Sequence, residues 1–111
     1  MDILICAHDK DASAIYEDVK AYFSREFPDA ALSWKRSGSL LTTSMDISEA
    51  EITRAFEALV KSYPRLDVKA FCSYDVREDD RSAQWWGTTE IHSTTEDGET
   101  KIVSSSSTYW N

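Results

Sequence analysis

Apolar side chains recur every three or four residues in two segments of the chain, and this spacing predicts two amphipathic helices. The first segment spans residues 9–27 and ends before Pro28, which cannot continue a helix. The second opens with Ser48 and Glu51 in a capping-box arrangement and ends before Pro64. The apolar stripes comprise Ala12, Ile15, Tyr16, Val19, Tyr22, Phe23 and Phe27 in the first helix, and Ile52, Ala55, Phe56, Leu59, Val60 and Tyr63 in the second.

Four other segments have the residue patterns of β-strands. Residues 2–7 form a nearly continuous apolar run, which is typical of a central strand buried on both faces. Residues 31–36 and 39–47 predict two strands joined by a turn at Gly38. Residues 67–77 alternate between apolar and polar side chains, which predicts a strand with one helix-covered face.

The order of these elements is strand-helix-strand-strand-helix-strand, which is the split-βαβ, ferredoxin-like arrangement. A further pair of β-like runs flanks Asp97-Gly98, a strong signal for a tight hairpin turn. We therefore predict an α+β protein with one domain over residues 1–111. It would have a ferredoxin-like βαββαβ core in residues 1–77 and an additional C-terminal β-hairpin in residues 84–110.

A two-residue turn in this hairpin would place Trp85 opposite Trp110 and Trp86 opposite Tyr109. The four aromatic residues have two interpretations. They could anchor a protein partner, because Trp and Tyr are enriched at interface hot spots. Alternatively, one pair could fill a small second core under the hairpin while the other pair seals the ribbon. Trp34 is a further candidate for the same cluster.

The composition is acidic, which narrows the possible partners. Lys and Arg together number 12 and Asp and Glu number 20, giving a net charge of −8. Direct binding to nucleic acid depends on Lys and Arg that neutralise phosphates, so we expect none. RNA-binding modules of similar topology stack bases on aromatic residues of the central strands, and residues 3–7 and 39–47 contain no aromatic residue.

The acidic residues are spread evenly, with 10 in residues 1–55 and 10 in residues 56–111. Solubility alone would produce such a spread. The densest acidic stretches are residues 78–80 and 96–99. Whether these two stretches meet on one face of the fold decides whether they can imitate a phosphate backbone.

No group of residues has the spacing of a known catalytic or metal site. Cys6, His8, Cys72 and His92 would be a ligand set for Zn²⁺ if Cys6 and Cys72 lay close together on neighbouring strands. Their spacing matches no standard zinc pattern, however. Cys6 also lies in an apolar run, where a thiol is typically inert. We therefore predict a protein that is not an enzyme and has no cofactor and no metal.

Nothing in the sequence indicates a membrane segment or a secretory signal. No stretch approaches the roughly 20 apolar residues of a membrane helix. The short apolar run near Met1 has no preceding basic region, and two cysteines are too few for a small secreted scaffold. We expect a cytoplasmic protein that does not bind membranes.

The C-terminal third resembles the YubB-type ferredoxin-like domain family. The motifs that carry this resemblance are Trp86-Gly87-Thr88, Glu96-Asp97-Gly98 and Thr108-Tyr109-Trp110. The chain departs from the family in having Thr89-Glu90 where members usually have Lys-Trp, and in stopping at Asn111 without a Ser-Pro-Pro segment. The family occurs largely on phages and plasmids and has no established chemistry. The resemblance implies an accessory protein of a mobile genetic element.

The leading functional prediction is a non-catalytic, acidic, protein-binding accessory protein. It would inhibit a host nucleic-acid-handling or defence complex, of the anti-CRISPR or anti-restriction type, through a negatively charged surface. The alternatives are a homo-oligomeric interaction module, which would pair through Phe71 and Leu40, and a small-molecule sensor with a Trp-rich pocket. The residues predicted to bind the partner are Glu78, Asp79, Asp80, Trp85, Trp86, Glu96, Asp97, Glu99, Tyr109 and Trp110.

Overall fold

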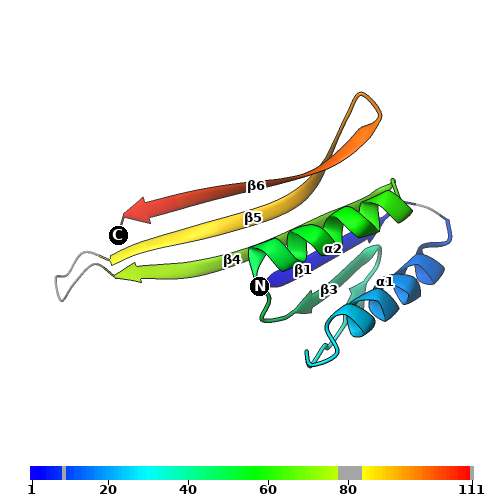
Figure 1. Cartoon of the computed structure of the whole chain (residues 1–111), viewed down its shortest axis with the longest axis horizontal. Helices are drawn as coiled ribbons and strands as arrows, with labels where there is room; N and C mark the ends of the chain where they lie inside the picture. Colours follow the sequence, from blue (N-terminus) through cyan, green and yellow to red (C-terminus); the bar gives the residue numbers. More distant parts are fainter. Residues whose placement is uncertain (9, 78–83, 111) are drawn as a thin grey trace.

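The computed structural model describes residues 1–8, 10–77 and 84–110, with the backbone alone for residues 74–77, 84–86 and 108–110. It shows an α+β fold with two helices and a six-stranded sheet, in which all neighbouring strands are antiparallel (Figure 1). The strand order is β2-β3-β1-β4-β5-β6. The elements are β1 (Asp2–Ala7), α1 (Ala12–Glu26), β2 (Lys35–Ser37), β3 (Leu40–Ser44), α2 (Glu49–Ser62), β4 (Leu66–Arg77), β5 (Gln84–Glu96) and β6 (Glu99–Trp110).

Strand β1 lies in the middle of the sheet, between β3 and β4, as its apolar sequence predicts. The prediction that this strand is buried on both faces was wrong, however. Ile3 and Ile5 are fully buried, whereas Leu4 and Cys6 on the opposite face are only partly buried. The reason is that both helices pack on the same side of the sheet, so the other side has no covering layer among the described residues.

The two helices and one side of the sheet share a single hydrophobic core. The predicted apolar stripes supply its helical part, which confirms the periodicity of both segments. The buried core residues are Ile15, Tyr16, Val19 and Phe23 from α1, Ile52, Ala55, Phe56, Leu59 and Val60 from α2, and Ile3, Ile5, Leu41, Val68, Ala70 and Ile91 from the sheet.

The boundaries of α2 follow the predicted signals. Ser48 is the N-cap, and its Oγ accepts a hydrogen bond from the Glu51 amide at 3.2 Å. The hydroxyl of Ser48 donates to the Glu51 carboxylate at 2.8 Å, where the capping box predicts a bond from the Ser48 amide instead. The helix ends at Ser62, two residues before Pro64.

The second and third strands are shorter than predicted. Strand β2 comprises only Lys35–Ser37, and residues 31–34 precede it without strand pairing. Instead of a neighbouring strand's amide, the Thr43 hydroxyl donates to the Ser33 carbonyl at 2.9 Å. The Thr43 side chain therefore supplies the hydrogen bond that the sequence pattern predicts from the backbone of a neighbouring strand.

The C-terminal hairpin has the predicted turn and the predicted pairing. Asp97 and Gly98 have φ angles of 53° and 77°, which are typical of a type I′ turn. In β5 and β6, Trp85 pairs with Trp110 and Trp86 with Tyr109.

The hairpin extends the sheet directly, because β5 pairs with β4 from Lys69–His92 to Arg77–Gln84. Strands β4, β5 and β6 run beyond the helices (Figure 1), and the molecule measures 52 × 36 × 25 Å. Within the described part of the chain, neither helix combines the length and the apolar character needed to cross a bilayer.

Candidate functional site

The sheet face opposite to the helices is the first candidate site, and we call it the open face. Strand alternation and pairing assign its side chains, and three rows cross the central strands. The open face includes Asp2, Leu4, Cys6, His8, Lys35, Leu40, Thr42, Ser44, Asp67, Lys69, Phe71, Glu90 and His92, and the pairing of β5 with β6 continues it through Glu96, Glu99, Lys101 and Val103. Phe71 is 37% exposed, which is unusual for a large apolar side chain on a central part of a sheet.

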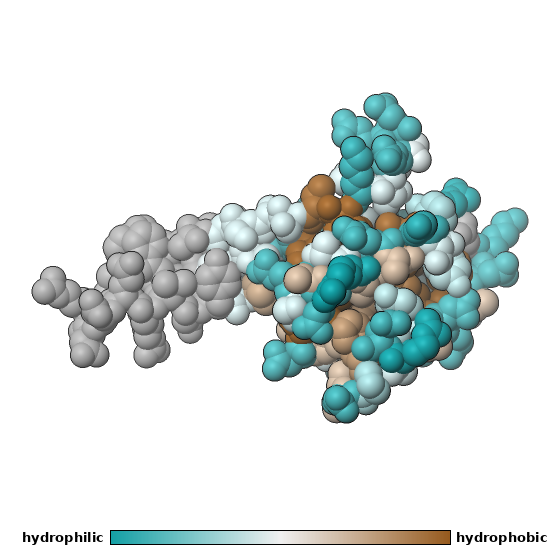
Figure 2. Space-filling view, in the orientation of Figure 1, coloured by the Kyte–Doolittle hydropathy of each residue, from teal (hydrophilic) through white to brown (hydrophobic). Residues whose placement is uncertain are grey.

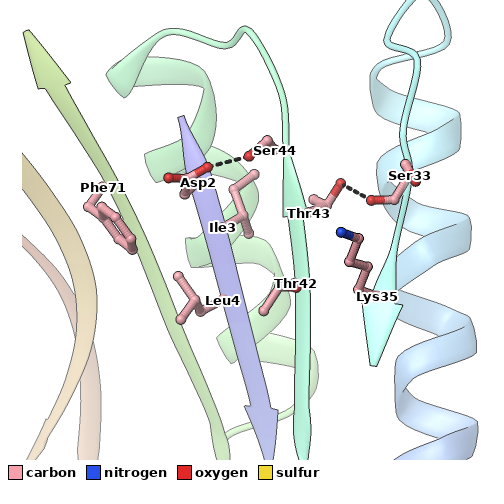
Figure 3. A pocket seen from close by; sticks show the side chains of 9 residues that line it. All are labelled: Asp2, Ile3, Leu4, Ser33, Lys35, Thr42, Thr43, Ser44 and Phe71. Atoms are coloured by element: carbon pink, nitrogen blue, oxygen red, sulfur yellow. Dashed lines mark hydrogen bonds between the residues drawn. The ribbon is translucent and has the colours of Figure 1, made fainter. Parts of the chain in front are cut away.

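One shallow depression lies at the Phe71 end of the open face and has a volume of about 510 Å³ (Figure 3). Leu4 lies between Phe71 on β4 and Thr42 on β3. Asp2 accepts a hydrogen bond from the Ser44 hydroxyl at one edge of the depression. This end of the face is therefore apolar at its centre and polar at its rim.

A second depression, of about 290 Å³, continues the open face toward the other end of β1. It shares Leu4 with the first depression and is also lined by Cys6, Leu40, Lys69 and His92. The two depressions together form one continuous shallow surface over β3, β1, β4 and β5. Neither has the enclosed shape of a typical small-molecule pocket.

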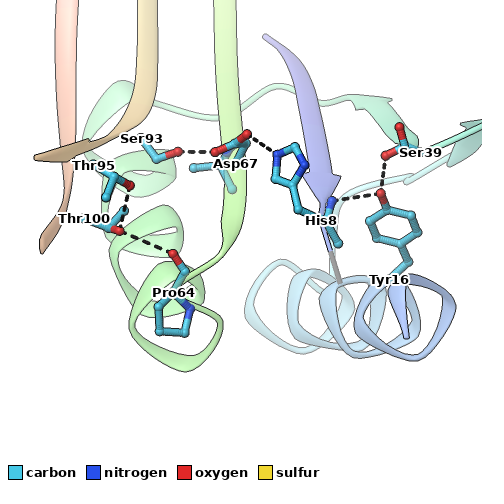
Figure 4. A network of polar contacts seen from close by, with 10 residues as sticks. His8, Tyr16, Ser39, Pro64, Asp67, Ser93, Thr95 and Thr100 are labelled. Carbon is cyan, nitrogen blue, oxygen red and sulfur yellow. Dashed lines mark hydrogen bonds and ion pairs between the residues drawn. The ribbon is translucent and has the colours of Figure 1, made fainter. Parts of the chain in front are cut away.

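Two sets of charged side chains on the open face are paired with one another. The Glu90 Oε1 atom lies 3.3 Å from Lys69 Nζ and 3.4 Å from His92 Nδ1. His8 Nε2 lies 2.5 Å from Asp67 Oδ2 (Figure 4). Both histidines of the chain thus face the same uncovered surface.

His92 Nδ1 is buried and forms no hydrogen bond to the described residues. The Glu90 carboxylate lies within ion-pair distance of this atom, so the two attract each other when the imidazole carries a proton on both nitrogens. Sequence reasoning missed this Lys69–Glu90–His92 group. The signal was available, because the hairpin register and the alternation of β4 together place all three side chains on one face.

The two cysteines lie on opposite faces of the sheet. Cys6 pairs with Asp67, and both side chains lie on the open face. Cys72 lies five residues after Asp67 on β4, so strand alternation places its side chain on the face that the helices cover. Five strand residues span about 17 Å. Cys6 and Cys72 therefore do not lie close together, as a shared zinc site would require, and both are free thiols. The described residues contain no group of three His, Cys, Asp or Glu side chains placed to hold a metal.

The hairpin tip is the second candidate site, and we define it as Glu96, Asp97 and Glu99. All three side chains are exposed. The tip is held against the segment that follows α2, because the Thr100 hydroxyl donates to the Pro64 carbonyl at 3.3 Å. Figure 2 shows apolar surface gathered beside α2 near the hairpin, where Val60, Pro64 and Ile102 line a depression of about 600 Å³. The tip carboxylates thus project from an anchored part of the fold.

The structure does not describe the remaining predicted partner-binding side chains. Glu78, Asp79 and Asp80 lie outside the described residues, as do the side chains of Trp85, Trp86, Tyr109 and Trp110. Residues 78–83 lie in sequence between Arg77 and Gln84, which pair at the end of β5 opposite to the tip. The length of β5 separates those two ends by about 40 Å. The tip therefore has to be considered as an acidic site of its own.

Trp34 does not join the other tryptophans. Its ring packs edge-on against Phe23 of α1 with 5.5 Å between ring centroids. It precedes β2, which is at the opposite edge of the sheet from β6. Trp34 therefore belongs to the main core, and the suggestion that it shares the hairpin cluster was wrong.

Two tyrosines on the helices have altered acidity. The Tyr63 hydroxyl donates to Asp18 Oδ2 at 2.5 Å, and this hydrogen bond raises the pKa of Tyr63 above its usual value. Partial burial raises the pKa of Tyr22, and the nearby Glu26 carboxylate adds to the effect. Both groups lie on the helical layer, so the open face and the tip do not depend on them.

The sequence matches no known protein-family model, and no curated protein is significantly similar to it. The resemblance to the YubB-type family therefore stays a prediction based on its short motifs.

Proposed function

We propose that this chain is a non-catalytic, protein-binding accessory protein of a mobile genetic element, which binds a basic partner through its hairpin tip. One observation carries the proposal. Glu96, Asp97 and Glu99 are exposed together at a tight turn that a hydrogen bond from Thr100 anchors to Pro64, just after α2. Three carboxylates held close together in this way present a dense negative charge to a basic protein surface.

The physical basis is electrostatic complementarity. Carboxylates at the tip attract Lys and Arg side chains that otherwise bind phosphates, and this attraction speeds the encounter between the partners. The type I′ turn fixes the backbone before binding, so little conformational entropy is lost at the tip. The partner class that fits is a host nucleic-acid-handling or defence complex, of the CRISPR or restriction type, with a basic nucleic-acid channel.

The assignment to a mobile genetic element rests on the fold and the motifs. We propose that β1 to β4 with the two helices form a ferredoxin-like core, because the strand order β2-β3-β1-β4 supports this topology. The hairpin extends that core, and its motifs resemble the YubB-type family. In this proposal, the core is a scaffold that positions the tip.

A competition experiment tests the proposal. A purified CRISPR effector complex and a purified restriction complex are each bound to labelled duplex DNA and titrated with this protein. We expect the protein to displace the DNA from at least one complex. The combined variant Glu96→Gln, Asp97→Asn and Glu99→Gln is expected to weaken this displacement at least about tenfold, because it removes the charge and preserves the shape.

The matched control removes the same number of charges from the helical layer. The combined variant Glu17→Gln, Glu26→Gln and Asp29→Asn changes three exposed carboxylates on α1 and the segment after it, and we expect it to displace DNA as the unmodified protein does. Equal loss in both variants would show that only the net charge matters and would overturn the role of the tip. Failure of the unmodified protein to displace DNA from either complex would overturn the proposal itself.

A further inference from the structure

The two edge strands of the sheet are protected to very different degrees against pairing with another chain. Strand β2 has only three residues, and two of them, Lys35 and Arg36, are charged. Short edge strands and charges at the edge are common devices that prevent such pairing. Strand β6, at the other edge, has 12 residues and contains neither a charged residue nor a proline after Lys101.

Strand β6 also lacks the irregularities that make an edge unsuitable for pairing. It pairs with β5 residue for residue from Glu99 to Trp110, without a bulge. On its other side, no strand of the described part of the chain pairs with it (Figure 1). The side chains of residues 103–107 are exposed. The outer edge of β6 is therefore accessible to another strand.

The register of the hairpin identifies the backbone groups that face outward. A two-residue turn closes with a hydrogen-bonded pair, here Glu96 and Glu99, and such pairs alternate with non-hydrogen-bonded pairs along an antiparallel ladder. The N–H and C=O groups of every second residue of β6 therefore point away from β5. These residues are Thr100, Ile102, Ser104, Ser106 and Thr108.

We propose that a second copy of this chain adds its own β6 to this edge, in an antiparallel pair that is two-fold symmetric about Ser104. The residues with outward-facing backbone groups then pair with one another, Ile102 with Ser106 and Ser104 with its counterpart. The two-fold axis is perpendicular to the sheet. The helices of both copies therefore lie on the same side of one continuous sheet.

The lengths of the two edges favour this arrangement over a chain of copies joined head to tail. A head-to-tail assembly pairs β6 of one copy with β2 of the next, and β2 offers only three residues to the 12 of β6. The β6 strand of a second copy matches the full length of this edge. The symmetric pair uses both unprotected edges and leaves only the two β2 edges exposed, so the assembly ends at two copies.

The charges of β6 are compatible with pairing to itself. In this register Lys101 lies opposite Ser107, so the paired strands do not bring like charges together. The hairpin tips of the two copies extend in opposite directions, because Glu99 and its counterpart are ten strand residues apart, or about 34 Å. This separation exceeds the Debye length of about 10 Å at 0.1 M salt. The repulsion between the two acidic tips is therefore largely screened.

Sedimentation equilibrium of the full chain over a wide range of concentration tests this proposal. We expect a mass that rises toward twice 12.6 kDa. Ser104→Pro is expected to raise the dissociation constant of the dimer at least about tenfold, because it removes the amide hydrogen at the two-fold axis. This variant is expected to fold, since an edge strand tolerates proline where the N–H faces solvent. Ser104→Ala, which loses the same hydroxyl but keeps the amide, is the matched control and is expected to dimerise as the unmodified protein does.

A second variant places a charge at the axis without changing the backbone. Ser104→Lys sets two like charges directly opposite each other and is expected to raise the dissociation constant at least about threefold at low salt. Ser24→Lys, which adds the same charge to an exposed position of α1, is its matched control and is expected to leave the dimer intact. A strictly monomeric mass, a mass that grows beyond two copies, or an unchanged dimer in either Ser104 variant would overturn the proposal.

Disulfide formation tests the register independently. In a background with Cys6→Ser and Cys72→Ser, which removes both free thiols, Ser104→Cys is expected to form a disulfide between two copies under mild oxidation. The Cα atoms of a hydrogen-bonded antiparallel pair lie about 5.5 Å apart, which is within the range that a disulfide spans. Ser24→Cys in the same background is expected to stay monomeric on a non-reducing gel. Equal disulfide formation by the two variants would overturn the proposed pairing.

The dimer is independent of the proposed role of the tip. The tip variant with Glu96→Gln, Asp97→Asn and Glu99→Gln is expected to dimerise as the unmodified protein does. Conversely, a monomeric protein that still displaces DNA through its tip would overturn only the dimer.

Discussion

Tyr16 connects three parts of the fold through one hydroxyl group. The side chain is 1% exposed, and its oxygen accepts a hydrogen bond from the Ala7 amide at 3.0 Å and donates one to the Ser39 carbonyl (Figure 4). The Arg36 guanidinium lies over the ring, 4.9 Å from its centroid. The sequence predicts that Tyr16 is in the core but gives no sign of these bonds, because they depend on where β1 and the β2–β3 turn end.

Replacing this tyrosine tests how much its hydroxyl contributes to the stability of the fold. Tyr16→Phe is expected to lower the free energy of unfolding by about 1–3 kcal/mol, because it leaves the buried Ala7 amide without a partner. Urea denaturation measures the effect. Tyr22→Phe, on the half-buried edge of α1, is the control and is expected to change stability by less than about 0.5 kcal/mol. Equal effects of the two substitutions would contradict the role of the Tyr16 hydroxyl.

The bond between Tyr63 and Asp18 predicts a pH dependence of stability. The pKa of Tyr63 is raised from 10.0 in the folded protein, so folding favours the protonated hydroxyl. Its contribution to stability is complete below the pKa of the unfolded chain and is lost as the pH rises through the higher pKa of the folded protein. The group is exposed, and we therefore expect a loss of less than about 1 kcal/mol.

Urea denaturation at several alkaline pH values checks this dependence. The unmodified protein is expected to lose more stability above about pH 10 than Tyr63→Phe, which has no hydroxyl to ionise. Parallel pH curves for the two proteins would show that the bond contributes nothing.

At the scale of secondary structure, local signals determine most of what the sequence predicts correctly. The cap at Ser48, the stop before Pro64 and the Asp97-Gly98 turn each act over a few residues, and each appears where its signal lies. The errors fall where distant residues decide the outcome. Residues 31–34 do not pair as a strand, since Thr43 supplies a side-chain bond to Ser33 instead.

The hairpin turn permits a direct test at this scale. Gly98 has a φ of 77°, a backbone conformation that residues other than glycine, asparagine and aspartate rarely adopt. Gly98→Ala is expected to lower the free energy of unfolding by about 1–2 kcal/mol, measured by urea denaturation. Gly98→Asn is the matched control and is expected to lower it less, because asparagine tolerates positive φ. A larger loss with asparagine than with alanine would contradict this explanation.

For the whole molecule, the sequence predicts the charge but not its distribution over the surface. The acidic stretches 78–80 and 96–99 are separated by 15 residues in sequence, and the second lies at a tip that β5 carries about 40 Å from the Arg77–Gln84 pair. The open face was predicted in part, because the sequence suggests an exposed surface through Phe71 and Leu40. The placement of both helices on one side of the sheet shows that Leu4 and Cys6 of β1 belong to the same uncovered surface.

The central position of β1 also determines the order in which the fold can be completed. Asp2 pairs with Ser44 and Phe71, which are far along the chain, whereas β5 and β6 close on each other across a two-residue turn. Pairings between distant residues close large loops and slow folding. When the full chain refolds, we therefore expect the hairpin to form early and the core to form late. During synthesis, one edge of the apolar β1 stays unpaired until β4 has been made. In that interval, β1 is the segment of the chain most exposed to aggregation.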